Sequence, residues 1–145
     1  MLSKQDIEIL IVDDNDISRS MLRHILTSEA FNVVGEASSG VAALDWLQKT
    51  IPEIVCLDVM MPDISGLEIL EHIKNLSPET VVVMVTGSNN KETVVSAIKA
   101  GANGFIVKPF NPATLLQTMN SLVTKYYRPL RYLIDRKKIL QRSGL

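Results

Sequence analysis

Five short apolar runs, each followed by a stretch with a different periodicity, constrain the fold of this chain more than any other feature of its sequence. The runs are rich in Val and Ile and contain few polar residues: Ile7–Val12, Val33–Ala37, Ile54–Leu57, Val81–Val85 and Phe105–Val107. Runs of this kind are typical of strands that are buried on both faces, as in a parallel sheet. The sequence therefore predicts five such strands.

The segments between the runs have the period of an amphipathic helix. Their apolar residues recur three and four positions apart, which places them on one helix face. The residues are Met21, Leu22, Ile25 and Leu26; Leu67, Leu70 and Ile73; and Leu115, Leu116, Met119, Leu122 and Val123, with shorter segments of the same kind at 41–47 and 94–100. Ser65–Glu68 has the pattern of a capping box, and Asn111 precedes a first-turn proline. Gly101 suits a left-handed helix end.

Strands that alternate with helices predict a doubly wound α/β fold. Right-handed crossovers then give a five-stranded parallel sheet with helices on both faces. In such sheets, ligands bind beyond the carboxyl ends of the strands. The residues directly after each apolar run are therefore the candidate functional residues.

The length of 145 residues predicts one domain, and its composition excludes several classes of protein. Cys56 is the single cysteine, so an intramolecular disulfide is excluded. No apolar run approaches the roughly 20 residues of a membrane-spanning helix, and Met1–Ile9 is too polar for a signal peptide. We therefore expect a cytoplasmic protein without membrane insertion.

Charge is distributed unevenly along the chain. Residues 1–124 contain 8 basic and 15 acidic side chains, whereas residues 125–145 contain 7 basic side chains and one acidic side chain. Phosphate contacts require clustered Lys and Arg, so the acidic body argues against direct nucleic-acid binding by this part. Whether the basic residues 125–145 bind nucleic acid stays open.

Charged and polar side chains follow four of the five runs. Asp13 and Asp14 follow the first, Asp58 the third, Thr86 the fourth and Lys108 the fifth. Three neighbouring carboxylates repel one another, and a hard divalent cation such as Mg²⁺ would relieve that repulsion. The lysine can pair with an added anion, and the threonine can donate to a phosphate oxygen. The set suits phosphoryl transfer onto a carboxylate.

Four motifs in this order resemble the receiver domain of two-component response regulators. They are Asp13-Asp14, the stretch Leu57–Gly66, Thr86-Gly87, and the stretch Gly104–Phe110. The resemblance covers roughly residues 6–124, and we assign residues 1–124 to the receiver domain. It implies the flavodoxin-like, chemotaxis-regulator-like fold with strand order 2-1-3-4-5.

The resemblance also implies a role for each site residue. Asp58 would accept phosphate from a phosphohistidine on a sensor histidine kinase or a phosphotransfer protein. Mg²⁺ would be bound directly by Asp14, mainly through water by Asp13, by Asp58 itself, and by the backbone carbonyl of Met60.

The remaining implied roles concern the switch. Thr86 would hydrogen-bond the phosphoryl group, Lys108 would form an ion pair with it, and the Lys108–Pro109 peptide bond would be cis. Phe105 would swing inward when Thr86 moves toward the phosphate. Many family members carry tyrosine at this position, so here no hydroxyl is left to signal outward. Met60 and Ser88 flank the pocket, at positions where the family tunes the lifetime of the phosphate.

Each site residue has a simpler explanation when taken alone. Asp13 and Asp14 could cap the first helix. Thr86 could belong to a simple turn, and Lys108 could be a surface lysine that ends a strand. We favour the functional interpretation because the motifs occur together.

Four further residues have no predicted functional role. Cys56 is expected to be a buried and inert thiol. His24 and His72 are expected on solvated helix surfaces, because neither has the spacing of a metal ligand. Trp46 is expected to pack a helix.

The tail, residues 125–145, is predicted to be a basic, helical extension. Pro129 is expected to interrupt or kink the fifth helix, or to begin a new one. Apolar residues then recur at near-helical spacing: Leu130, Leu133, Ile134 and Leu140. The extension could be a helix docked on the body, a dimerisation element, a contact for an acidic partner or a membrane surface, or a linker.

Two hypotheses for the whole chain follow. In the first, it is a stand-alone switch that catalyses only its own phosphorylation and dephosphorylation, and phosphate on Asp58 changes which downstream protein it binds or whether it forms a homodimer. In the second, it is the N-terminal receiver of a larger regulator with a DNA-binding or enzymatic output domain. A phosphatase with an aspartyl nucleophile is disfavoured, because Met60 stands where such enzymes need an acid–base aspartate.

Overall fold

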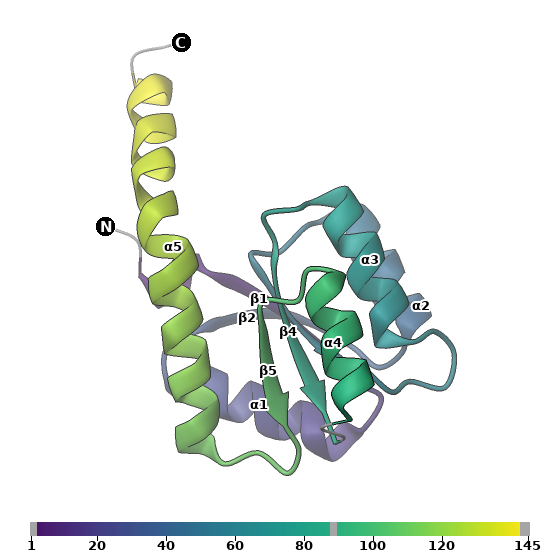
Figure 1. The fold of residues 1–145 in the computed structure, drawn as a ribbon. Helices are drawn as coiled ribbons and strands as arrows, with labels where there is room; N and C mark the ends of the chain where they lie inside the picture. The colour runs from purple at the N-terminus through teal and green to yellow at the C-terminus, as the bar shows by residue number, and fades with distance from the viewer. Residues whose placement is uncertain (1–2, 88–89, 143–145) are drawn as a thin grey trace.

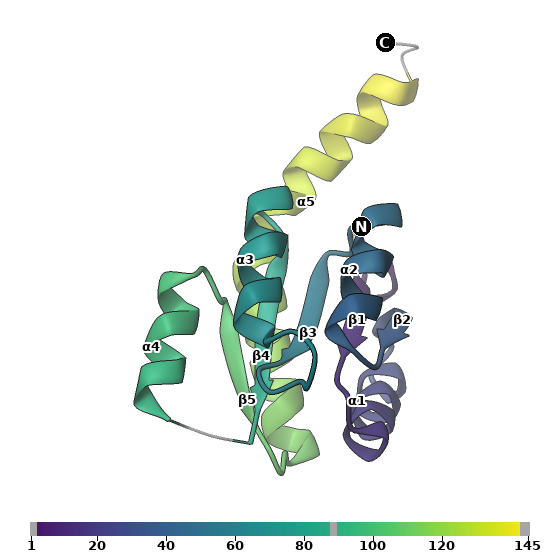
Figure 2. The same ribbon diagram turned by 90° about the vertical axis from the view of Figure 1, so that its right-hand side faces the viewer.

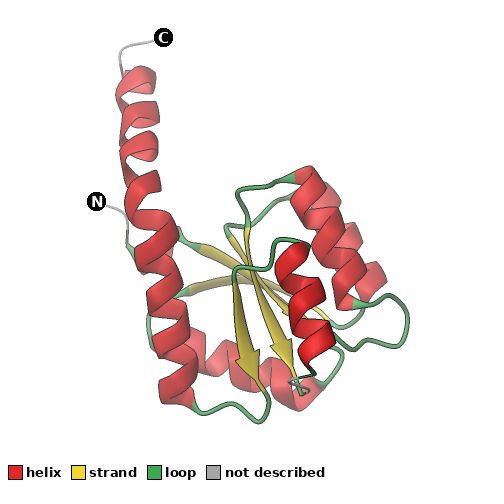
Figure 3. Cartoon of the chain, in the orientation of Figure 1, coloured by secondary structure: helices red, strands yellow, loops and turns green. Residues whose placement is uncertain are grey.

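The fold is a five-stranded parallel sheet with helices on both faces, as the sequence predicts (Figures 1 and 3). The computed structural model describes residues 3–87 and 90–142, with side chains described as far as Tyr127. The strands are β1 (Glu8–Val12), β2 (Asn32–Ala37), β3 (Ile54–Asp58), β4 (Val81–Thr86) and β5 (Gly104–Val107). The helices are α1 (Asp16–Ser28), α2 (Gly40–Lys49), α3 (Gly66–Leu76), α4 (Lys91–Lys99) and α5 (Pro112–Arg142), after a short 3₁₀ turn at Lys4–Asp6. The strand order β2-β1-β3-β4-β5 confirms the order that the family resemblance implies.

The sheet separates two apolar cores. On one face, α1 and α5 pack against alternate strand residues such as Ile9, Ile11 and Val83. On the other face, α2, α3 and α4 pack against Leu10 and Val82 and their neighbours (Figure 2). All residues of β3 and β4 are buried, which explains why their sequences are almost wholly apolar.

The positions of the helix caps that the sequence indicates are confirmed. The Ser65 hydroxyl accepts a hydrogen bond from the Glu68 amide at 3.3 Å, at the start of α3. The Asn111 side chain accepts one from the Ala113 amide at 2.8 Å, at the start of α5. Gly101 has a φ of 104° directly after α4, a conformation that a residue with a Cβ rarely adopts.

The residues without a predicted role also behave as expected. Cys56 is buried, and burial raises the pKa of its thiol to about 12, which keeps it protonated and unreactive. His24 and His72 are exposed on their helices. Trp46 packs from α2 over Gly35 of β2, where a Cβ would lie 2.5 Å from the indole nitrogen.

Pro129 does not interrupt the last helix. α5 runs as one helix from Pro112 to Arg142, and its last part extends beyond the sheet (Figures 1 and 2). A proline removes the hydrogen bond to the carbonyl four residues earlier. Here that residue is Lys125, which is exposed, so water can take the place of the missing donor. Among the described residues, no helix is both long and apolar enough to cross a bilayer.

Candidate functional site

The carboxyl ends of four adjacent strands bring the predicted site residues together. Asp13 directly follows β1, Asp58 ends β3 and Thr86 ends β4. Lys108 directly follows β5, and its amide donates to the carbonyl of Thr86 at 2.8 Å. Because these strands are parallel neighbours, the four residues meet at one edge of the sheet.

Lys108 connects the two buried carboxylates. Its ammonium lies 2.7 Å from Oδ2 of Asp13 and 3.4 Å from Oδ2 of Asp58. Asp13 is 0% and Asp58 5% exposed, so both charges are held away from bulk water. The contact with Asp13 is an ion pair whose alignment is not that of a hydrogen bond, and within the described residues Oδ2 of Asp13 accepts none.

Burial dominates the ionisation of Asp58. Desolvation raises its pKa to about 6, the nearby charge of Lys108 opposes the rise, and the charge of Asp13 adds to it. One ammonium therefore does not offset the cost of holding this carboxylate ionised beside a second one.

The acidic cluster has the composition of a divalent-cation site. One carboxylate oxygen from each of Asp13, Asp14 and Asp58 lies within 4.8 Å of the others. Asp14 is exposed, so the cluster is open to solvent on one side. Hard oxygen donors and a buried carboxylate oxygen without a hydrogen bond fit Mg²⁺, the cation expected here from the sequence.

Met60 contributes its backbone to this cluster. Its amide donates to Oδ1 of Asp58 at 3.2 Å, while the residue is 74% exposed. This arrangement agrees with metal binding through the Met60 carbonyl, a role that does not depend on which side chain is present. Ser88, the other predicted flanking residue, lies outside the described residues.

The simpler explanation for the two N-terminal aspartates is wrong. The N-cap of α1 is Asn15, whose side chain accepts from the Ser18 amide at 2.9 Å. Instead, Oδ1 of Asp13 accepts a hydrogen bond from the Asn15 amide at 2.9 Å, and its Oδ2 forms the ion pair with Lys108.

The predicted switch residues lie beside the cluster. Thr86 is 2% exposed, and Phe105 is half-buried against the core on the α4 side. Phe105 pairs with Met84 and Val107 with Thr86 in the register of β4 and β5. The Lys108–Pro109 peptide bond is cis, as the resemblance implies.

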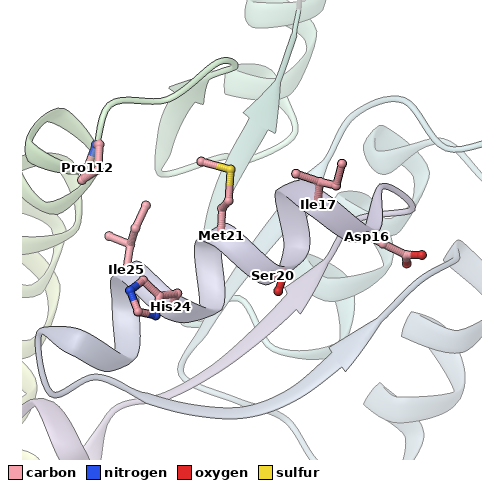
Figure 4. Close-up of a pocket in the computed structure, with 7 residues that line it drawn as sticks. All are labelled: Asp16, Ile17, Ser20, Met21, His24, Ile25 and Pro112. Carbon is pink, nitrogen blue, oxygen red and sulfur yellow. The ribbon is translucent and has the colours of Figure 1, made fainter.

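An apolar groove next to the cluster was not identified from the sequence. It runs along α1 and is lined by Asp16, Ile17, Ser20, Met21, His24, Ile25 and Pro112 (Figure 4). Ile17 is 72% and Met21 45% exposed. The signal was present, because Ile17, Met21 and Ile25 recur four residues apart on a helix face.

This fold and site define a class of proteins: α/β signalling domains whose sheet carries an acidic cluster and one lysine at its carboxyl edge. The chain belongs to the response regulator receiver domain family, which it matches over residues 9–120. It is 35% identical over 114 residues to the chemotaxis protein CheY of Thermotoga maritima, covering 79% of this chain and 95% of that protein.

Solved structures agree with this assignment. A CheY-like receiver domain protein from Methanospirillum hungatei is similar with a TM-score of 0.79 and 29% identity, covering 85% of this chain and 98% of that one. NtrX from Brucella abortus, in complex with ADP, gives a TM-score of 0.78 and 34% identity, covering 88% of this chain but 29% of that one. The family thus includes chains that are little more than this domain and chains that are much longer.

Proposed function

We propose that this chain is a phosphorylation-activated switch in which Asp58 accepts a phosphoryl group from a phosphohistidine of a sensor histidine kinase or a phosphotransfer protein. The observation that carries the proposal is the buried carboxylate of Asp58 beside Lys108 and two further aspartates. The family assignment supports it, because receiver domains are signalling switches rather than enzymes that act on other molecules.

The chemistry follows from charge. An oxygen of Asp58 forms the new bond to phosphorus as the phosphorus–nitrogen bond of the phosphohistidine breaks, and the electron pair leaves on the imidazole. Mg²⁺, bound by Asp13, Asp14, Asp58 and the carbonyl of Met60, would neutralise the oxygens that meet there. Lys108 pairs with the added phosphoryl group, and the hydroxyl of Thr86 donates to it.

The donor must reach Asp58 at the carboxyl edge of the sheet, which supports the α1 groove as its docking surface. Helix α1 begins two residues after Asp14, and Asp16 lines the groove. Ile17 and Met21 are exposed on the groove side of α1 (Figure 4). A partner helix with an apolar face would cover them while its phosphohistidine lies over the acidic cluster.

The output is a change of surface. When Thr86 moves toward the phosphate, Phe105 turns inward and the surface of α4, β5 and α5 changes, which shifts the population toward a form that binds a downstream protein. Exposed apolar side chains on that surface support a protein target: Val95 is 40%, Ile98 57% and Val107 50% exposed.

Whether this switch acts alone is a separate proposal. The near-complete coverage of CheY proteins supports a stand-alone receiver that acts by protein–protein contact. The alternative, a receiver with a further output domain as in longer regulators, predicts that residues 125–145 form a linker. Homodimerisation on phosphorylation stays a prediction.

The proposal is tested with acetyl phosphate and MgCl₂, followed by intact-protein mass spectrometry. We expect one phosphoryl group on the wild type and none on Asp58→Asn. Asp45→Asn, on the exposed side of α2, is the matched control and should be phosphorylated like the wild type. Stoichiometric phosphate on Asp58→Asn would refute the assignment.

A further inference from the structure

Asp63 joins the loop after Asp58 to a distant helix. It lies in residues 59–65, which connect β3 to α3. Its Oδ1 accepts a hydrogen bond from the Gly40 amide at 3.0 Å, and its Oδ2 accepts one from the Val41 amide at 2.9 Å. These two amides are the first of α2, where helix N–H groups have no partner within the helix.

The carboxylate is not the ordinary cap of α2. Ser39 has that role, since its hydroxyl accepts from the Ala42 amide at 3.0 Å. Asp63 accepts from the two amides that Ser39 leaves, and hydrogen bonds from N–H groups to a carboxylate are stronger than those between neutral groups. The helix therefore has a local cap and, in addition, a contact from 22 and 23 residues away.

The other end of the loop is fixed on the phosphorylation site. The Met60 amide donates to Oδ1 of Asp58 at 3.2 Å, and the Gly66 amide donates to the carbonyl of Val59 at 2.9 Å. A Cβ on Gly66 would lie 2.1 Å from the carbonyl oxygen of Asp58. The loop is thus packed closely where it leaves the strand.

The loop is packed as closely where it meets α2. A Cβ on Gly40 would lie 2.7 Å from the Cβ of Ile64. Only a glycine lets the loop approach the helix closely enough for both oxygens of Asp63 to be used.

We propose that Asp63 is a positioning residue for the metal site: it fixes the β3–α3 loop on α2 and so holds the backbone of Met60 in place for Mg²⁺. The inference rests on the proposed function, because the Met60 carbonyl is a ligand only if the acidic cluster binds Mg²⁺. Asp13, Asp14 and Asp58 lie on or next to the strands. Loss of the hydrogen bonds between Asp63 and α2 therefore leaves these three residues in place and affects only the loop.

The test compares Mg²⁺ affinity with stability. Titration calorimetry with MgCl₂ gives the dissociation constant, and thermal unfolding without Mg²⁺ gives the stability of the full chain. We expect Asp63→Ala to raise the dissociation constant for Mg²⁺ roughly 10-fold, the scale on which groups that support metal ligands act. Asp63→Asn, which keeps one acceptor oxygen, should recover part of that loss.

Ser39→Ala is the matched control, since it weakens the start of α2 without touching the loop. It should lower the unfolding temperature while leaving the dissociation constant unchanged. If Asp63→Ala binds Mg²⁺ like the wild type, the inference about Asp63 is wrong but the proposed function stands. The same holds if Ser39→Ala weakens Mg²⁺ binding as much as Asp63→Ala does. A wild type that binds no Mg²⁺ would overturn the proposed function as well. If Asp63→Ala does not fold, Asp63→Asn carries the same comparison.

Discussion

The charged side chains at the two ends of the parallel sheet differ in how completely they are hydrogen-bonded. At the carboxyl end, three carboxylates gather around one lysine, and Oδ2 of Asp13 accepts no hydrogen bond within the described residues. At the amino end, the ammonium of Lys74 donates to three oxygens: the carbonyls of Pro78 at 3.3 Å and Thr80 at 2.6 Å, and Oδ1 of Asn103 at 2.9 Å. The carboxyl end thus holds a buried carboxylate oxygen that accepts no hydrogen bond, whereas the ammonium at the amino end has three acceptors.

Further contacts at the amino end connect segments that are distant in sequence. Oδ1 of Asn103 also accepts from the Val82 amide at 2.8 Å, which connects the start of β5 to β4. The hydroxyl of Tyr127 donates to the carbonyl of Glu53 at 2.6 Å, which ties α5 to the start of β3. From this comparison we expect stability to depend mainly on the amino end and Mg²⁺ binding on the carboxyl end, so substitutions should separate the two properties.

The largest expected effect is that of Tyr127→Ala. This residue is 4% exposed, in the core that α1 and α5 form with the sheet. Its removal leaves a cavity and should lower the free energy of unfolding by about 3–5 kcal/mol, measured by urea denaturation. The folded fraction should still be phosphorylated by acetyl phosphate at the wild-type rate. A well-folded Tyr127→Ala variant with impaired phosphorylation would show that the two ends are coupled.

Lys74→Met should have the next largest effect. Methionine keeps most of the chain length but leaves the Thr80 carbonyl without its donor and removes one of the two donors to Oδ1 of Asn103. We expect the free energy of unfolding to fall by about 1–3 kcal/mol in the same assay. Lys99→Met, on the exposed side of α4, is the control and should change it by less than about 0.5 kcal/mol. Equal effects of the two variants would remove Lys74 from the stabilising network.

At the carboxyl end, a substitution should raise the free energy of unfolding instead of lowering it. Asp13→Asn removes one of the carboxylates that compete for Lys108, while Asp58 keeps its partner. In buffer without Mg²⁺ we expect the free energy of unfolding to rise by about 1 kcal/mol, a gain typical of relaxing a functional site. Mg²⁺ binding, measured by calorimetry, should weaken in the same variant. Loss of stability would mean that this carboxylate is structural.

The same contrast explains which features could be predicted from the sequence. The strands and the residues at their carboxyl ends follow from local patterns, because a parallel sheet of buried strands forces Asp13, Asp58 and Lys108 to one edge. Their order along the chain resembles a known family, so the site could be named before its geometry was seen.

The supporting contacts could not be predicted in this way. Asp63 reaches an amide 23 residues away and Lys74 a side chain 29 residues away. Both contacts depend on how α2 and β5 pack against the loop and α3, which no local period specifies. The packing of α5 also continues past residue 124 to Tyr127, and the helix runs through Pro129 without a break.

The smallest predicted effect concerns Glu53 at the amino end, because burial raises its pKa as it raises that of Asp58 at the carboxyl end. Burial raises the pKa of Glu53 above 4.5, although the Glu8 amide, 2.7 Å from Oε2, opposes the rise. The folded protein therefore keeps this proton longer than the unfolded chain, and the free energy of unfolding should fall as the pH rises from 4.5 through the raised pKa. Above that window the contribution is constant.

Glu53→Gln removes this titration, so urea denaturation of both proteins across the window isolates it. Asp58 titrates in both proteins and lies five residues along the strand, roughly 16 Å away, so its contribution cancels in the difference. The stability of the wild type relative to Glu53→Gln should decrease with rising pH. A constant difference would mean that the Glu8 amide fully offsets the burial of this carboxylate, so that its pKa is the same in the folded and the unfolded chain.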